Sequence, residues 1–262
     1  MCFALLALRQ HPHYPFILAA NRDEFFDRPA IPLGVWPTNP ELVGGIDQSS
    51  QGSWLALNQH NLKFALVTNV RQGTPKVGER SRGLLVSEFV ASPDPVLDVL
   101  HSIEQTKNNY AGFNLLAGHL SNDLYYLSNQ NNTGSQLLNK GFHGLSNASL
   151  NTPWPKLERG LINFKQVVTT SQTNSPENLR DKLFELLADK TKASQEALPD
   201  TGVGLEKELW LSSIFIAPGF MNYGTRCSTV ILADSNKQVF CYERTYYSDN
   251  RSSDIKYYFH SA

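Results

Sequence analysis

Apolar residues in the N-terminal third come in short runs of strand length, separated by turn residues. The first two runs, residues 3–8 and 15–20, flank His11, Pro12 and His13, so we expect them to pair as a hairpin. Further strands are predicted at 42–47, 53–58 and 62–69. The proline-rich segment between Phe26 and Leu42 is expected to be a loop.

The pattern then changes to helical spacing and back again. The predicted helices cover residues 81–92, 95–106, 155–168 and 176–188. Between the two helix pairs the pattern predicts strands at 113–118, 124–128 and 136–144. Residues 191–210 are expected to be loop with some helix, and the chain closes with strands at 225–232, 238–246 and 255–260.

This order is strands, helices, strands, helices, strands, without the regular alternation that builds a parallel sheet. We therefore expect an α+β fold in which two stacked, mostly antiparallel sheets are covered by helix pairs. No linker stands out, so one domain over residues 1–262 is predicted.

Composition narrows the class of protein. Of 262 residues, 41% are hydrophobic and 18% are charged, which is typical of a soluble globular protein. A small-molecule substrate or ligand is the expected partner. A net charge of −1 gives no electrostatic footprint for nucleic acid. No apolar run approaches the roughly 20 residues of a membrane span, and the start has no basic segment typical of a signal peptide. We expect a cytoplasmic protein.

Cys2 has two interpretations. Free cysteine packs like a small apolar residue, so Cys2 fits the buried start of a strand. Alternatively, Cys2 is small enough for Met1 to be removed, which would leave a thiol and an α-amine on one residue. An α-amine has a pKa of about 7.7–8.0, so an N-terminal cysteine can carry its own base.

A polar cluster, Asn21-Arg22-Asp23-Glu24, follows the second predicted strand. If the first two strands pair, this cluster lies beside Cys2. Asp23 would then accept a hydrogen bond from the α-ammonium group, and Asn21 would donate to an oxyanion. The alternative is a solvated, salt-bridged turn.

Other side chains give weaker signals. His11 and His13 are expected to be solvated, and no spacing of histidines or cysteines predicts a metal site. A tight turn at residues 235–236 would place Cys241 opposite Val230, so Cys227 and Cys241 are expected to be reduced core residues. Aromatic residues beside the polar blocks, including Trp54 and Trp154, are either packing residues or the apolar wall of a pocket.

Six blocks occur in order: MCFALLA, AANRDEFFDRP, GGIDQSSQGSWLALN, ALVTNVR, HGLSN followed by PWPK, and YGTRCSTV. Together they resemble the NRDE family, also called the transport and Golgi organisation protein 2 family, from residue 1 to about residue 232. The resemblance implies an N-terminal-nucleophile (Ntn) hydrolase fold, a four-layer αββα sandwich. That architecture agrees with the layers expected from the order of elements.

The resemblance also implies roles for individual residues. Acylases of the cholylglycine hydrolase type, which share this fold, carry Arg-x-x-Asp or Arg-Asn-x-Asp at the end of the second strand. Asn21 and Asp23 match the last part of this pattern. Ala20 stands where the pattern has its arginine, and an arginine occurs nearby at Arg22 instead. Asn69 and Asn147 are similar to the asparagines near the oxyanion, and Arg226 to a late arginine near the nucleophile. The implied catalytic residues are Cys2, Asp23, Asn69, Asn147 and Arg226, and the candidate substrate-binding residues are Asn21, Arg22, Trp54 and Trp154.

Two functions follow as expectations. The first is an Ntn amidohydrolase that uses Cys2 on an acyl amide and needs no cofactor. The second is a non-catalytic binding or trafficking protein for haem or an acyl lipid on the same scaffold, since the resemblance associates the family with haem trafficking and acyl-lipid metabolism. A third and least favoured hypothesis is a purely structural partner protein.

Overall fold

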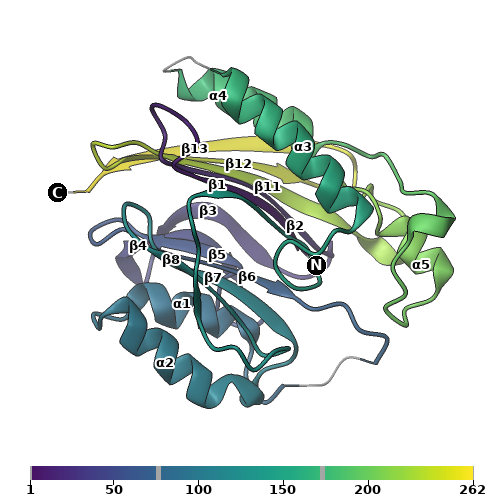
Figure 1. Cartoon of the computed structure of the whole chain (residues 1–262), viewed down its shortest axis with the longest axis horizontal. Helices are drawn as coiled ribbons and strands as arrows, with labels where there is room; N and C mark the ends of the chain where they lie inside the picture. The colour runs from purple at the N-terminus through teal and green to yellow at the C-terminus, as the bar shows by residue number, and fades with distance from the viewer. Residues whose placement is uncertain (1, 75–77, 172–174, 262) are drawn as a thin grey trace.

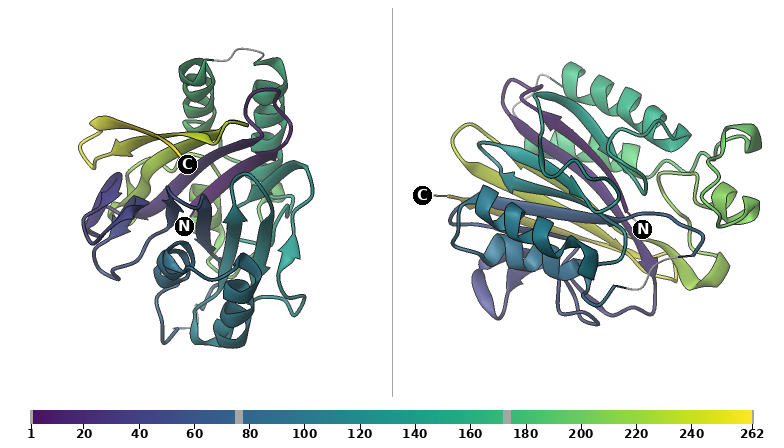
Figure 2. Two further views of the ribbon diagram at one scale, coloured as in Figure 1. Left: turned by 90° about the vertical axis from the view of Figure 1, so that its left-hand side faces the viewer. Right: turned by 60° about the horizontal axis from the view of Figure 1, so that its bottom comes forward.

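The computed structural model describes residues 2–74, 78–171 and 175–261. Within them, two antiparallel sheets lie face to face (Figure 1). The first sheet has the order β10-β1-β2-β11-β12-β13, and the second has the order β3-β4-β5-β6-β7-β8-β9. Helices α3 and α4 cover the outer face of the first sheet, and α1 and α2 cover that of the second, as both views in Figure 2 show. The expected αββα sandwich is confirmed.

The bounds of the elements are as follows. The first sheet contains β1 (Cys2–Leu8), β2 (Phe16–Phe25), β10 (Gly141–Leu145), β11 (Tyr223–Ala233), β12 (Gln238–Tyr246) and β13 (Ser252–His260). The second contains β3 (Ala30–Trp36), β4 (Asn39–Asp47), β5 (Leu55–Asn58), β6 (Lys63–Asn69), β7 (Phe113–His119), β8 (Leu124–Ser128) and β9 (Gln136–Leu137). The helices are α1 (Arg82–Ala91), α2 (Val96–Thr106), α3 (Pro155–Thr170), α4 (Pro176–Leu187) and α5 (Leu205–Trp210).

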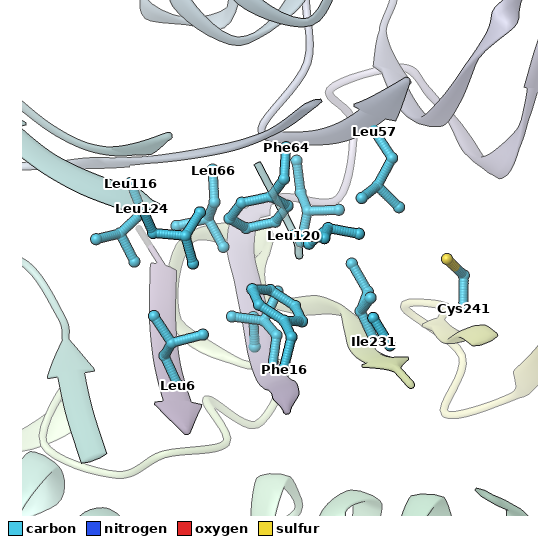
Figure 3. Packing of buried hydrophobic residues seen from close by; sticks show 14 of the residues in the cluster. Leu6, Phe16, Leu57, Phe64, Leu66, Leu116, Leu120, Leu124, Ile231 and Cys241 are labelled. Carbon is cyan, nitrogen blue, oxygen red and sulfur yellow. The ribbon is translucent and has the colours of Figure 1, made fainter. Parts of the chain in front are cut away.

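Hydrophobic side chains fill the space between each pair of layers. Alternation along β1 sends Phe3 toward the helices α3 and α4 and Leu6 toward the second sheet. Figure 3 shows Leu6 and Phe16 of the first sheet facing Phe64 of the second, and the rings of Phe16 and Phe64 lie 5.3 Å apart. Burial of these apolar faces is the main force that holds the layers together.

Two predicted segments differ from the structure. The proline-rich segment expected to be a loop contains β3, an edge strand of the second sheet. The strand predicted at 136–144 is split, because β9 pairs with β8 in the second sheet whereas β10 pairs with β1 in the first. The chain therefore crosses from one sheet to the other between Leu137 and Gly141.

The structure confirms that the two cysteines of the β11–β12 hairpin are free and buried, but the register of the hairpin differs from the predicted one. Ile231, rather than Val230, lies opposite Cys241. The reason is a loop one residue longer than expected, in which Lys237 takes a positive φ of 62°. A residue with positive φ at the end of a three-residue hairpin loop is a common arrangement. Cys227 and Cys241 are both free and buried, as expected.

The expectation that His11 is solvated is wrong. His11 is 6% exposed, and its Nε2 donates to the carbonyl oxygen of Ser171 at 2.5 Å. Its Nδ1 accepts hydrogen bonds from the backbone N–H groups of His13 and Tyr14, both at 3.2 Å. His13, two residues on, is exposed as expected. Burial lowers the pKa of His11, because the charged imidazolium form loses its contact with water.

Stability should therefore fall as pH drops below the usual histidine pKa of about 6.5. The unfolded chain binds a proton at His11 in that range and the folded chain does not, so the proton favours unfolding. Urea unfolding at pH 7.5 and pH 5.5 measures this loss, and His11→Gln should make it smaller. His13→Gln is the matched control, since His13 is exposed, and an equal pH dependence in both variants would contradict the assignment.

Candidate active site

Register in the first sheet places Cys2 directly opposite Arg22. The expected proximity of Cys2 to the polar cluster is therefore confirmed. The cluster is not a turn, however, because β2 continues through it to Phe25. Strand alternation then sends Arg22 to the face that meets the second sheet, and Asn21 and Asp23 to the helix side.

A cavity of about 700 Å³ opens where β1 begins and β2 ends. Its wall also includes the end of β6, the start of α1 and part of α5, and Figure 1 shows the N-terminus on the side of the molecule that carries α5. The residues of the predicted site that line this cavity are Cys2, Arg22, Asp23, Trp54 and Asn69.

Cys2 is half-buried and lines the cavity. Burial raises its pKa, and the negative charges of Asp23 and Glu24 act in the same direction, whereas the terminal ammonium group and Arg22 oppose them. A thiol in such a setting is mostly protonated at neutral pH, and the thiolate is the reactive form. Cys2 therefore needs a base close by before it can act as a nucleophile.

Asp23 lines the cavity but is only 1% exposed. Its Oδ1 accepts a hydrogen bond from Thr225 Oγ1 at 2.7 Å, and its backbone oxygen accepts one from the Tyr223 hydroxyl at 2.9 Å. Burial raises the pKa of Asp23, while the charge of the terminal ammonium group, the charge of Lys156, the hydrogen bond from Thr225 and the charge of Arg71 lower it. The carboxyl group is thus fixed in position and surrounded by cations.

Arg22 is held flat against the aromatic wall. Its guanidinium carbon lies 4.2 Å from the centre of the Trp54 ring, and its Nη2 donates to Asp47 Oδ2 at 3.1 Å. The same Asp47 oxygen accepts from Arg28 Nε at 2.6 Å. Trp54 is fixed in turn by Gly45, where a Cβ atom would come within 2.0 Å of the indole ring. Arg22 and Trp54 therefore form a rigid wall beside Cys2.

Asn69 and Asn147 contact each other, but only Asn69 lines the cavity. Asn147 is fully buried, and its Nδ2 donates to Asn69 Oδ1 at 2.9 Å and to the Asn69 backbone oxygen at 3.1 Å. Because Oδ1 of Asn69 faces Asn147, its Nδ2 is turned away from Asn147. Asn147 therefore orients Asn69, and Asn69 is the better placed of the two to donate to a bound molecule.

Asn21 and Arg226 lie outside the cavity wall. Asn21 Nδ2 donates to the backbone oxygens of Leu187 and Ile214, which ties β2 to the end of α4. Arg226 is the extra residue of a β-bulge in β11, and its Nη1 donates to the backbone oxygens of Phe25 and Arg28. These two side chains hold the end of β2 rather than a ligand.

A buried group of charges that the sequence did not single out lies behind Asp23. Arg71 Nη1 contacts Glu208 Oε2 at 2.6 Å, and both side chains are 3% exposed. Lys156, also 3% exposed, donates to the Leu211 backbone oxygen at 3.0 Å. Burial and the charge of Arg71 lower the pKa of Lys156 to about 7. Trp154 does not line the main cavity; its ring lies 4.8 Å from the guanidinium carbon of Arg71.

Positive side chains outnumber negative ones on the described cavity wall. Within the described residues, Arg82 and Lys207 have no carboxylate partner, and Arg82 Nη1 donates to the Gly112 backbone oxygen at 3.0 Å. Such a wall attracts a ligand that carries negative charge. The lining cations are Arg22, Arg28, Arg71, Arg80, Arg82 and Lys207, and the lining carboxylates are Asp23, Glu24 and Asp47.

Metal ligands and membrane spans were also sought in the described part of the chain. No group of three or more His, Cys, Asp or Glu side chains is arranged to hold a metal ion there. None of the helices in those ranges is long and apolar enough to cross a membrane.

Comparison with known proteins gives a consistent result. The family model described as "Transport and Golgi organisation 2" matches residues 1–248. A mouse protein named "Transport and Golgi organization 2 homolog" is 33% identical over 244 residues, covering 88% of this chain and 87% of its own length. The bovine "Transport and Golgi organization protein 2 homolog" is 34% identical with the same coverage. The Drosophila melanogaster "Transport and Golgi organization protein 2" is 28% identical over 265 residues, covering 94% of this chain and 92% of its own length.

Proposed function

This chain belongs to the transport and Golgi organisation 2 family, and from that premise we propose that it is an amidohydrolase whose nucleophile is Cys2. One observation carries the proposal. Cys2 begins β1 at the wall of a 700 Å³ cavity, opposite Arg22 and within electrostatic reach of the buried Asp23. The substrate class is an acyl amide.

The reaction begins after removal of Met1, which leaves the α-amine on Cys2. The neutral amine accepts the thiol proton while Sγ bonds to the carbonyl carbon of the amide. The oxyanion that forms accepts a hydrogen bond from Asn69 Nδ2, which Asn147 orients. The amine then gives its proton to the leaving nitrogen, and water hydrolyses the thioester to release the acid. Asp23 anchors the amine, and Arg226 supports the end of β2.

The test combines intact mass with alkylation. We expect native protein to lack the mass of Met1, and iodoacetamide near pH 7 to modify Cys2 at least ~10-fold faster than the buried cysteines. Cys227 and Cys241 are internal controls in the same molecule, because both are buried away from the cavity that Cys2 lines. Retention of Met1, or a Cys2 no more reactive than those two, would overturn the proposal.

A second candidate function is the binding and transfer of an anionic apolar ligand such as haem or an acyl lipid. The excess of cations over carboxylates on the cavity wall favours it. The residues of the cavity wall fit haem. Arg82 would pair with its carboxylates, and the flat face of the ring would pack on the wall formed at Trp54. The described lining residues include no histidine, so an iron ligand would have to come from Cys2, Met221 or Tyr223.

Haem titration followed by absorbance tests this candidate. We expect a spectral shift at micromolar haem, and Arg82→Met should weaken binding about 10-fold, as for loss of one charged contact. Arg251→Met is the matched control, since Arg251 is exposed and does not line the cavity. An unchanged haem spectrum, or equal weakening in both variants, would count against binding in this cavity.

A further inference from the structure

A chain of buried hydrogen bonds reaches Asn69 from the inner strands of the second sheet. It begins at Tyr126 of β8 and Asn114 of β7 and continues to Thr68 of β6, which lies opposite Asn114 in the register of the two strands. All three side chains are buried. Among the described residues, the wall of the 700 Å³ cavity includes Asn69 but none of these three. Any effect they have on a bound molecule therefore passes through Asn69.

Backbone carbonyl oxygens determine the direction of the bonds in this chain. Asn114 Nδ2 donates to the Ala148 backbone oxygen at 2.9 Å and to Thr68 Oγ1 at 3.2 Å. Since a carbonyl oxygen can only accept, turning the amide over would break the bond to Ala148. Asn114 Oδ1 is thus free to accept from the Tyr126 hydroxyl at 2.7 Å. Thr68 Oγ1 in turn donates its own proton to the Ser146 backbone oxygen at 2.9 Å.

These bonds hold residues 146–148, the loop after β10, against the second sheet. Asn147 lies between the two acceptors of that loop, and its backbone oxygen accepts from the Arg71 N–H at 2.8 Å. Its Nδ2 donates to the Asn69 backbone oxygen at 3.1 Å, so this amide also has one orientation. The same Nδ2 donates to Asn69 Oδ1 at 2.9 Å. Asn69 therefore keeps its own Nδ2, a donor, for the cavity that it lines.

We propose that Asn114 and Thr68 are positioning residues that act through Asn147 to keep the donor of Asn69 directed at the oxyanion. The inference rests on the proposed function, since it requires an oxyanion to form at Cys2. It deepens that function by extending the site to a buried network of the second sheet. If the loop shifts, Asn69 is free to turn over, and its Oδ1 would then repel the oxyanion instead of stabilising it.

Two reagents separate this role from a general effect on Cys2, because an oxyanion forms only in acyl transfer. With p-nitrophenyl hexanoate, Sγ of Cys2 bonds to the carbonyl carbon, the thiol proton passes to the α-amine, and p-nitrophenolate leaves. With iodoacetamide, Sγ bonds to carbon as iodide leaves, and no oxyanion forms. Release of p-nitrophenolate in the first turnover gives the rate constant for acylation, and mass spectrometry gives that for alkylation.

In Asn114→Leu and Thr68→Val, we expect acylation of Cys2 to be about 10-fold slower and alkylation to be unchanged. This loss is smaller than the roughly 10²–10³-fold drop for removal of an oxyanion donor, because the donor is present but no longer held. In an Asn69→Ala background, Thr68→Val should slow acylation no further, since no donor remains to be positioned. Valine keeps the shape of threonine, so this variant provides the test if Asn114→Leu does not fold.

Asn58→Leu is the matched control. Asn58 is a buried asparagine of the same sheet, its Nδ2 donates to the Val90 backbone oxygen at 3.2 Å, and it is not among the described residues of the cavity wall. Its replacement should lower stability and leave acylation as in the wild type. Loss of acylation in this control equal to that in Thr68→Val would refute the assignment.

The remaining outcomes distinguish this inference from the proposed function. A wild-type protein that is both alkylated and acylated at Cys2, combined with wild-type acylation in Thr68→Val and Asn114→Leu, would overturn this inference alone. Equal losses of alkylation and acylation in those variants would also overturn it, since they indicate a general structural effect. A wild-type protein that keeps Met1, or that is alkylated but not acylated at Cys2, overturns the proposed function and with it this inference.

Discussion

Replacement of Glu208 by leucine is expected to lower the free energy of unfolding by about 3–5 kcal/mol, because Arg71 would be left as an unpaired buried charge. Both side chains of this pair are 3% exposed, so water cannot take the place of the carboxylate. Glu208 Oε1 also accepts from the Thr201 backbone N–H at 3.0 Å, and that bond would be lost as well. Urea unfolding followed by tryptophan fluorescence measures the change.

Glu206→Leu serves as the matched control, since Glu206 lies on the same short helix α5 and is exposed. It should change stability by less than about 0.5 kcal/mol. The double variant Arg71→Leu with Glu208→Leu should recover much of the loss, because no buried charge remains. A single variant as stable as the Glu206 control would show that Arg71 is not held by Glu208.

Phe64→Ala should cost a similar amount, about 3–5 kcal/mol, for a different reason. Phe64 is fully buried between the two sheets and packs against Phe16 with the ring centres 5.3 Å apart. Its removal leaves a cavity that neighbouring strands cannot close, because both sheets are rigid and tightly packed. Thermal or urea unfolding measures the loss.

Tyr258→Ala removes another large aromatic side chain from a strand, but Tyr258 is 63% exposed. This control should stay within about 0.5 kcal/mol of the parent protein. If the two variants lost equal stability, the space between the sheets would not be the principal core.

Most of the fold was predictable because its hydrophobic pattern is local. The β1–β2 hairpin and the helix pairs follow directly from apolar runs and their spacing. Strand β3 was missed because its proline suggested a loop, yet an edge strand tolerates proline, which has no N–H to donate to a neighbour. The end of β2 was missed because its polar residues are satisfied by partners far along the chain, such as Thr225 and Asp47.

The candidate site was predictable in part. Cys2, Asp23 and Asn69 share one cavity, as the hairpin and the matching blocks indicated. The direction of Arg226 depends on a one-residue bulge, and a bulge reverses which face a side chain occupies without a clear sequence signal. Glu208 had no signal, because its role depends on its pairing with Arg71, 137 residues away in the chain.

Cys2, the proposed nucleophile, lies in the first sheet and Asn69 lies in the second, so their separation depends on how one sheet packs on the other. The loop after β10 joins the two sheets at this point: Thr68 Oγ1 donates to the Ser146 backbone oxygen at 2.9 Å, and the Arg71 N–H donates to the Asn147 backbone oxygen at 2.8 Å. These bonds resist sliding of the sheets along each other. The spacing of Cys2 and Asn69 is therefore established when the protein folds, and a ligand need not assemble it on arrival.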